Sequence, residues 1–144
     1  MVHRSHNLLF NPFLIEMLRG IERAKKAGWS VALFETYRSP ARQNILFSQG
    51  RESPGQIVTH TRGWHSWHQY GVAADIALLR EDRWSWDFDP ERLSKFFVGE
   101  WIHWGGPSDG PHYQWAKLPK LHEAQKIARD GNGILEFWST LKAP

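Results

Sequence analysis

The 144-residue sequence contains no cysteine, which excludes disulfides and thiolate metal sites. It also lacks the run of about 18 apolar residues that a membrane-spanning helix needs. Residues 1–20 carry charges and a proline where a signal peptide would need an uninterrupted apolar stretch. We therefore expect a protein without a membrane span that is made in the cytoplasm, and whose export would need outside help.

Strong charge of one sign is also missing, since the formal net charge is only +3 and the isoelectric point is about 9.4. This balance mildly favours anionic partners such as nucleic acid or a cell-wall polymer. No basic run is interleaved with aromatic residues, so we do not expect nucleic-acid binding. Tryptophan, in contrast, is abundant, with nine residues. Most should pack in the core or lie half exposed, and the alternative is a groove for sugar or peptide.

The length is that of one domain, and no repeat, low-complexity tract or linker divides residues 1–144. Helical spacing and proline positions predict helices that begin at Asn11-Pro12, Ser39-Pro40 and Asp89-Pro90, and two more over 119–130 and 133–141. Strands are predicted within 29–39, 72–79, 101–106 and 112–116. Residues 50–66 predict a long loop, which usually marks a functional or mobile segment. The pattern indicates an α+β domain with helices packed on a small antiparallel sheet.

The stretch "SWHQYGVAAD" places a carboxylate, Asp75, inside an apolar run that predicts a buried strand. A buried charge is costly unless it is paired or holds a metal. Strand alternation puts Asp75 on one face between Ala73 and Ala77, whose small side chains leave space beside it. His68 precedes the strand closely enough to lie over it.

A second cluster, "DGPHYQW", contains Asp109 and His112. Two imidazoles (His68 and His112) and the carboxylate of Asp75 match the three protein ligands of a catalytic zinc site, which leaves a fourth position for water. Asp109 would be the additional carboxylate that accepts a proton from this water, whose pKa zinc lowers to ~7. The spacing alone leaves alternatives open, because an aspartate near a glycine turn is more often a cap, and His65 is a rival ligand.

Three motifs in the same order resemble a known family. The pattern Ser-x-His-x-x-Gly-x-Ala-x-Asp is met by Ser66, His68, Gly71, Ala73 and Asp75. Upstream, "YRSPARQ" is similar to the family's Tyr-Arg-Ser/Thr segment, and downstream "WGGPSDGPHYQ" is similar to its Trp-Gly-Gly and Asp/Glu-x-x-His element. Over residues 29–116 the chain resembles the zinc peptidases that include D-Ala-D-Ala carboxypeptidases, vancomycin-resistance dipeptidases and phage L-alanyl-D-glutamate endopeptidases.

The resemblance implies a role for each matching residue: zinc ligands His68, Asp75 and His112, catalytic carboxylate Asp109, substrate or transition-state contact Arg38, and substrate-side hydrogen-bonding residue Ser66. Independently of the family, a guanidinium at the end of a strand can hold a carboxylate or a developing oxyanion, or it can form a surface ion pair. Position 109 is more often glutamate in the carboxypeptidase and dipeptidase branches, and aspartate there resembles the phage branch. The C-terminal 25 or so residues match no part of the family's pattern.

The implied fold is a small antiparallel sheet that carries the metal site and is flanked by helices, the D-Ala-D-Ala peptidase or hedgehog-like fold. The implied function is zinc-dependent hydrolysis of peptidoglycan stem peptides. An L-alanyl-D-glutamate endopeptidase fits best, as a monomeric phage endolysin that stays in the host cytoplasm until a separate pore releases it to the cell wall. The alternatives are a D-Ala-D-Ala carboxypeptidase or dipeptidase, and a catalytically inactive zinc-holding module that binds the wall. Asp109 argues against the inactive module, because a structural zinc needs no free carboxylate beside it.

Overall fold

The computed structural model describes residues 1–144, and its centre is a five-stranded sheet. The strands run in the order β1-β2-β5-β4, β3 pairs with β2, and every pair is antiparallel. Their bounds are β1 (Val31–Glu35), β2 (Ala73–Arg80), β3 (Arg83–Ser85), β4 (Ile102–Trp104) and β5 (His112–Trp115). The predicted antiparallel α+β architecture is confirmed, whereas β3 was not predicted.

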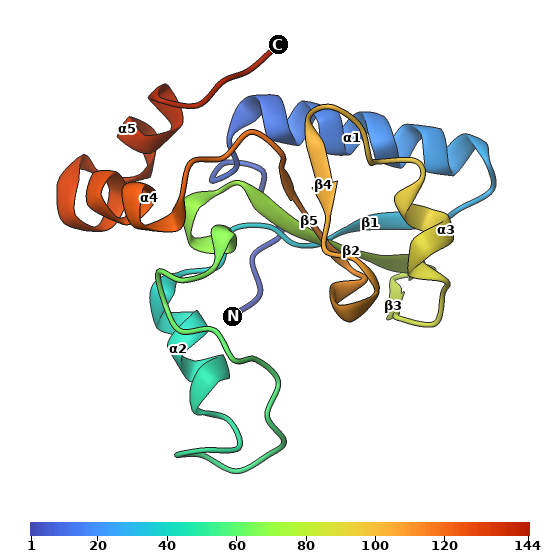
Figure 1. Ribbon diagram of the computed structural model, residues 1–144. Helices are drawn as coiled ribbons and strands as arrows, with labels where there is room; N and C mark the ends of the chain where they lie inside the picture. Colours follow the sequence, from blue (N-terminus) through green and yellow to red (C-terminus); the bar gives the residue numbers. More distant parts are fainter.

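Helices lie on both sides of this sheet, with α1 along one face and α2 with the loop after it on the other side (Figure 1). The α-helices are α1 (Asn11–Lys26), α2 (Pro40–Ser48), α3 (Pro90–Ser94), α4 (Leu121–Ile127) and α5 (Ile134–Ser139). Short 3-10 turns form η1 (Trp67–Tyr70) and η2 (Pro107–Asp109), and a π-helical segment, η3 (Ala128–Asn132), follows α4. The predicted starts of α2 and α3 are confirmed, because the side chains of Ser39 and Asp89 cap them. The predicted start of α1 at Asn11 is confirmed as well, although its N-cap residue is Phe10 and no side chain caps this helix.

The core fills the space between α1 and the sheet. Phe13 and Met17 of α1 are fully buried against Ala74 and Ile76 of β2. Because side chains alternate along a strand, Asp75 points to the opposite face. The residues on one face of β2 therefore pack in the core, and Asp75 on the other face is available for a functional site. None of the helices combines the length and the hydrophobicity that a membrane span requires.

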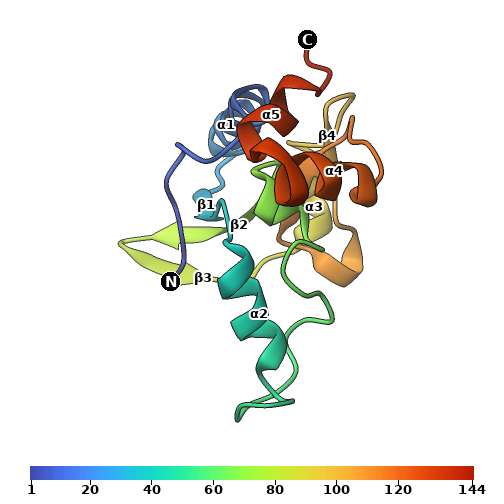
Figure 2. The same cartoon turned by 90° about the vertical axis from the view of Figure 1, so that its left-hand side faces the viewer.

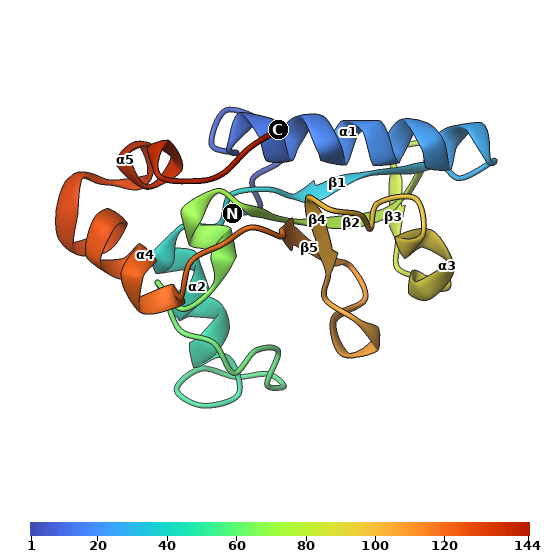
Figure 3. The same cartoon turned by 45° about the horizontal axis from the view of Figure 1, so that its top comes forward.

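The C-terminal helices pack beside η1 (Figure 3). The ring of Phe137 in α5 stacks on Trp67 at 6.3 Å and meets Tyr70 edge-on at 5.5 Å. The indole N–H of Trp138 donates to the Tyr70 carbonyl at 2.7 Å. This segment, which the motifs leave unexplained, supports the turn that carries His68.

Candidate metal centre

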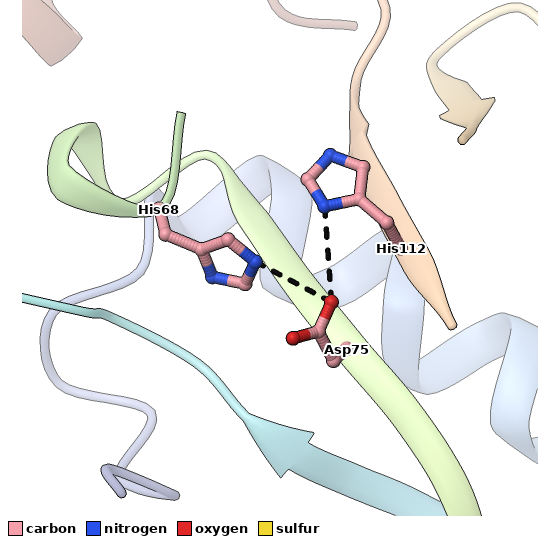
Figure 4. Close-up of side chains that lie close together, drawn as sticks. All are labelled: His68, Asp75 and His112. Carbon is pink, nitrogen blue, oxygen red and sulfur yellow. Dashed lines mark ion pairs between the residues drawn. The ribbon is translucent and has the colours of Figure 1, made fainter. Parts of the chain in front are cut away.

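Three side chains from three different elements converge on the open face of the sheet: His68 from η1, Asp75 from β2 and His112 from β5 (Figure 4). Asp75 Oδ1 lies 3.4 Å from His68 Nε2 and 3.7 Å from His112 Nδ1. All three ligand atoms lie within 4.8 Å of one another. Tetrahedral zinc with bonds of ~2.0–2.2 Å separates its ligands by about 3.4 Å. The cluster therefore fits one zinc ion with small adjustments.

The pairing of two strands brings Asp75 and His112 together. They are direct partners in the antiparallel ladder between β2 and β5. Directly opposed residues project to the same face with Cβ atoms about 5 Å apart. The two ligands therefore share a face whatever the surrounding loops do.

His68 reaches them because η1 is capped at both ends. The Ser66 side chain accepts from the His68 backbone N–H at 3.2 Å, and the Gln69 side chain accepts from the Ser66 N–H at 3.1 Å, which forms a capping box. At the other end, Gly71 adopts the left-handed conformation with φ of 68° and turns the chain into β2. Ser66, predicted to contact substrate, thus also positions a metal ligand.

Hydrogen bonds outside the cluster set the tautomer of both neutral imidazoles. His68 Nδ1 donates to the Thr36 carbonyl at 2.9 Å, and His112 Nε2 donates to Gln114 Oε1 at 2.8 Å. In the neutral rings the lone pairs are then on His68 Nε2 and His112 Nδ1, the two atoms that face Asp75, and metal binding displaces any second proton from these atoms. Both rings are preset for metal binding. The parts played by Thr36 and Gln114 were not predicted.

The charge state of Asp75 also suits a ligand. Burial alone would raise the pKa of this carboxyl, but His68 and His112 beside it hold the pKa far below its usual range. For His112, burial acts to lower the pKa, and the hydrogen bond and charge of Asp75 outweigh it and raise the pKa. Asp75 is therefore ionised, as metal coordination requires.

Beneath the cluster lies a buried ion network centred on Glu35, which sequence reasoning missed. Glu35 is 2% exposed and accepts from Arg38 Nε at 3.1 Å, Arg38 Nη2 at 2.6 Å and Arg42 Nε at 2.8 Å. Burial alone would raise the pKa of Glu35, and the two guanidinium groups lower it below its usual value. The only sequence signal was an acidic residue three positions before the arginine of the family motif.

Arg38 connects this network to the metal ligands. Its Nη2 also donates to Asp75 Oδ2 at 3.2 Å, and its Nη1 donates to Gln43 Oε1 at 3.1 Å. A guanidinium has five N–H donors, so one on Nη1 remains. The side chain is 14% exposed, which places the ion pair inside the site rather than on the surface. Its contact with substrate stays a prediction, and a bidentate contact would need these bonds to break.

A cleft of about 230 Å³ opens over the cluster, and Asp109 lies on its wall. Asp109 Oδ2 is 3.9 Å from His112 Nδ1, and its side chain is 61% exposed. Partial burial raises the pKa of Asp109, and the charge of Asp75 adds to this while His112 opposes it. This carboxylate is close enough to reach a water at the metal position without being one of the three converging ligands.

The predicted loop over residues 50–66 supplies another wall of the cleft through Val58, Thr59 and Thr61. This agrees with the functional interpretation of its length. His65, the rival ligand, is exposed and its Nδ1 lies 3.0 Å from the Gly63 carbonyl, outside the cluster. The structure thus brings together all six predicted site residues around one cleft and leaves His65 out.

The chain is similar to known proteins in sequence and in fold. No family model matches the chain. In sequence the chain is 33% identical over 109 residues to the peptidoglycan L-alanyl-D-glutamate endopeptidase CwlK of Bacillus subtilis (strain 168), a match that covers 63% of this chain and 64% of CwlK. The match therefore spans slightly less than two thirds of this relative.

Two solved structures share the fold. The Serratia marcescens L-Ala D-Glu endopeptidase ChiX superposes with a TM-score of 0.51 at 22% identity, over 81% of this chain and 89% of ChiX. VanYB in complex with D-alanine-D-alanine superposes with a TM-score of 0.50 at 17% identity, over 92% of this chain and 82% of VanYB. These findings confirm the predicted fold and the resemblance to this group of peptidases.

Proposed function

We propose that this protein is a zinc-dependent peptidase that hydrolyses the L-alanyl-D-glutamate bond of peptidoglycan stem peptides. The observation that carries the proposal is the cluster of His68, Asp75 and His112 with the additional carboxylate of Asp109 on the wall of the same cleft. A structural metal site is closed by four protein ligands, whereas three ligands beside a free carboxylate are typical of hydrolytic centres. The similarity to CwlK and ChiX supports the choice of bond.

Each residue around the cleft has a separate role in the proposed hydrolysis. The ion would be held by His68 Nε2, Asp75 Oδ1 and His112 Nδ1, and when bound it would supply Lewis acidity toward water and the scissile carbonyl. The Asp109 carboxylate takes a proton from the attacking water and returns it to the leaving amine nitrogen of D-glutamate. Ser66 Oγ accepts from the His68 backbone, so its own hydroxyl proton is free to donate to a substrate carbonyl.

The lining of the cleft suits a peptide. Of its ten lining residues one is hydrophobic, Val58, and the others offer hydroxyl, amide, imidazole, guanidinium or carboxylate groups. Pockets for apolar small molecules have mostly hydrophobic walls. A stem peptide presents amides and carboxylates at short intervals, and these match a wall of this kind.

We further propose that the protein acts as a phage endolysin, which remains in the host cytoplasm until a pore releases it to the wall. Aspartate at position 109 and the formal charge of +3, which suits an anionic wall, support this role. Expression inside bacteria tests it: culture turbidity should stay constant until the inner membrane is permeabilised and should then fall. Constant turbidity after permeabilisation would refute the lytic role.

The second candidate is a D-Ala-D-Ala carboxypeptidase, which the shared fold with VanYB favours. Mass spectrometry of products from a defined disaccharide-pentapeptide separates the candidates. Release of the disaccharide bearing only L-alanine supports the endopeptidase, and release of free D-alanine alone supports the carboxypeptidase. An intact substrate together with one bound zinc per chain would indicate the inactive binding module. A chelator-treated sample and the Asp109→Asn variant are the controls.

A further inference from the structure

Three aromatic side chains, Phe34, Trp84 and Trp86, form a patch outside the hydrophobic core. The ring of Phe34 lies edge-on to Trp84 at 5.1 Å and to Trp86 at 4.7 Å. None of the three belongs to the core cluster or packs against it. Trp86 is 49% exposed, and the Arg4 guanidinium lies over the rings of Phe34 and Trp84 at 4.9 and 5.0 Å. Core packing therefore does not account for this aromatic patch.

The patch lies on the same face of the sheet as the metal cluster. Trp84 is the direct partner of Leu79, which follows Asp75 by four positions in β2 and so shares its face. At about 3.4 Å per residue, Leu79 is roughly 14 Å from Asp75 along the strand, and Ala77 is about 7 Å away. The hairpin of β2 and β3 projects from one side of the molecule, away from α1 and α4 (Figure 2).

The two tryptophans of the patch also keep their hydrogen-bond donors free. Trp104, Trp115 and Trp138 donate their indole N–H groups to backbone carbonyls at 2.7–3.0 Å. Trp84 and Trp86 donate to no protein group, as is also true of the four remaining tryptophans, but Trp86 is the one exposed tryptophan of the chain. An exposed ring beside a free donor can bind a pyranose, whose C–H face lies on the ring while its hydroxyls accept from the N–H.

We propose that the aromatic patch binds the amino sugar to which the stem peptide is attached. This inference rests on the proposed function, because the sugar is linked through a lactyl group to the L-alanine whose carbonyl is attacked. One residue spans about 3.6 Å, and the lactyl group adds a similar length. The sugar therefore begins on the order of 7–10 Å from the scissile bond. Measured along β2 from Asp75, this range lies beyond Ala77 and short of Leu79, the residue opposite Trp84.

A pair of substrates tests the proposal: the free stem peptide, and the same peptide carrying its disaccharide. Wild-type protein should cleave the disaccharide-peptide with a kcat/KM about 3- to 10-fold higher, the usual worth of one aromatic contact. Trp86→Ala should abolish this preference and leave cleavage of the free peptide unchanged, and Trp86→Phe should retain part of it. Leu135→Ala, at an exposed residue of α5, is the matched control and should behave as wild type.

Equal rates on the two substrates in the wild type would overturn the proposal, and so would an equal loss on both in Trp86→Ala. If the wild type cleaves neither substrate, the proposed function fails, and binding of chitotriose then tests the patch separately. Quenching or a shift of tryptophan fluorescence that Trp86→Ala abolishes would support the patch. An unchanged spectrum in the wild type would refute it.

Discussion

Replacing Glu35 by glutamine should weaken zinc binding although the Glu35 carboxylate makes no hydrogen bond to a metal ligand. The carboxylate holds Arg38 through two hydrogen bonds and Arg42 through a third. Arg38 Nη2 is shared between Glu35 Oε1 at 2.6 Å and Asp75 Oδ2 at 3.2 Å. In Glu35→Gln the Arg38 guanidinium loses its nearer anionic partner. It then pairs more strongly with Asp75 and competes with the metal ion for this carboxylate.

The structure indicates how much stability and how much zinc affinity Glu35→Gln should lose. Breaking one side of a buried ion pair costs about 3–5 kcal/mol, and we expect the lower end because Arg38 and Arg42 are 14% and 20% exposed and can be partly solvated. Loss of an outer partner of a metal ligand usually reduces metal affinity by about 10- to 100-fold. Glu35 acts through Arg38, the outer partner of Asp75, so we expect the lower end of this range. Glu35→Gln should therefore lower both the free energy of unfolding and the affinity for zinc.

Two measurements check this: urea unfolding of the metal-free protein, and competition for zinc with a chelating dye. Glu16→Gln is the matched control, because Glu16 also pairs with an arginine three positions along the chain. This arginine, Arg19, is 64% exposed, and such a pair is worth only about 0–1 kcal/mol. Unchanged zinc affinity in a destabilised Glu35→Gln would reduce Glu35 to a purely structural role. No change in either quantity would refute the network altogether.

Three further predictions concern the metal ligands, the catalytic carboxylate and the turn that carries His68. His68→Ala should lose bound zinc by metal analysis and nearly all hydrolysis, whereas His65→Ala should keep both; retained zinc in the first variant would make the ligand set wrong. Asp109→Ala should keep its zinc and slow hydrolysis of muropeptides by ~10²–10⁴-fold, and lost metal would instead make this residue a ligand. Gly71→Ala should lower the midpoint of urea unfolding, since φ is 68° and a Cβ would meet the Leu8 carbonyl and the Trp138 ring; an unchanged midpoint would show that this turn is not constrained.

The parts of the fold that local chemistry decides could be predicted from the sequence. The prolines that open α2 and α3, with their Ser39 and Asp89 caps, need no tertiary information. Alternation within each strand also gives the faces of Asp75 and His112, although the pairing of the two residues is known only from the structure. In contrast, β3 has only three residues, and its turn uses Glu81 and Asp82 at positive φ, without the Asn-Gly or Asp-Gly pair that usually marks a two-residue hairpin.

The orientation of Glu35 could not be predicted, because it depends on a break in the strand. Regular alternation would place Leu33 and Glu35 on the same face. The register between β1 and β2 shifts between these residues, so that Leu33 pairs with Ile76 of the core face and Glu35 pairs with Asp75. Only the pairing of the two strands reveals this bulge, and with it the carboxylate beneath the site.

The same limit applies to the role of Arg38. The motif identifies a guanidinium near the metal ligands, but its free donors can be counted only after folding, when Glu35, Gln43 and Asp75 have taken four of the five. A bidentate pair with a substrate carboxylate would give up bonds to a buried anion, and that exchange is unfavourable. We therefore expect the cleft to hold its substrate by single hydrogen bonds, from the remaining Nη1 donor and the Ser66 hydroxyl, and to depend on the metal for most of its electrostatic attraction to the substrate.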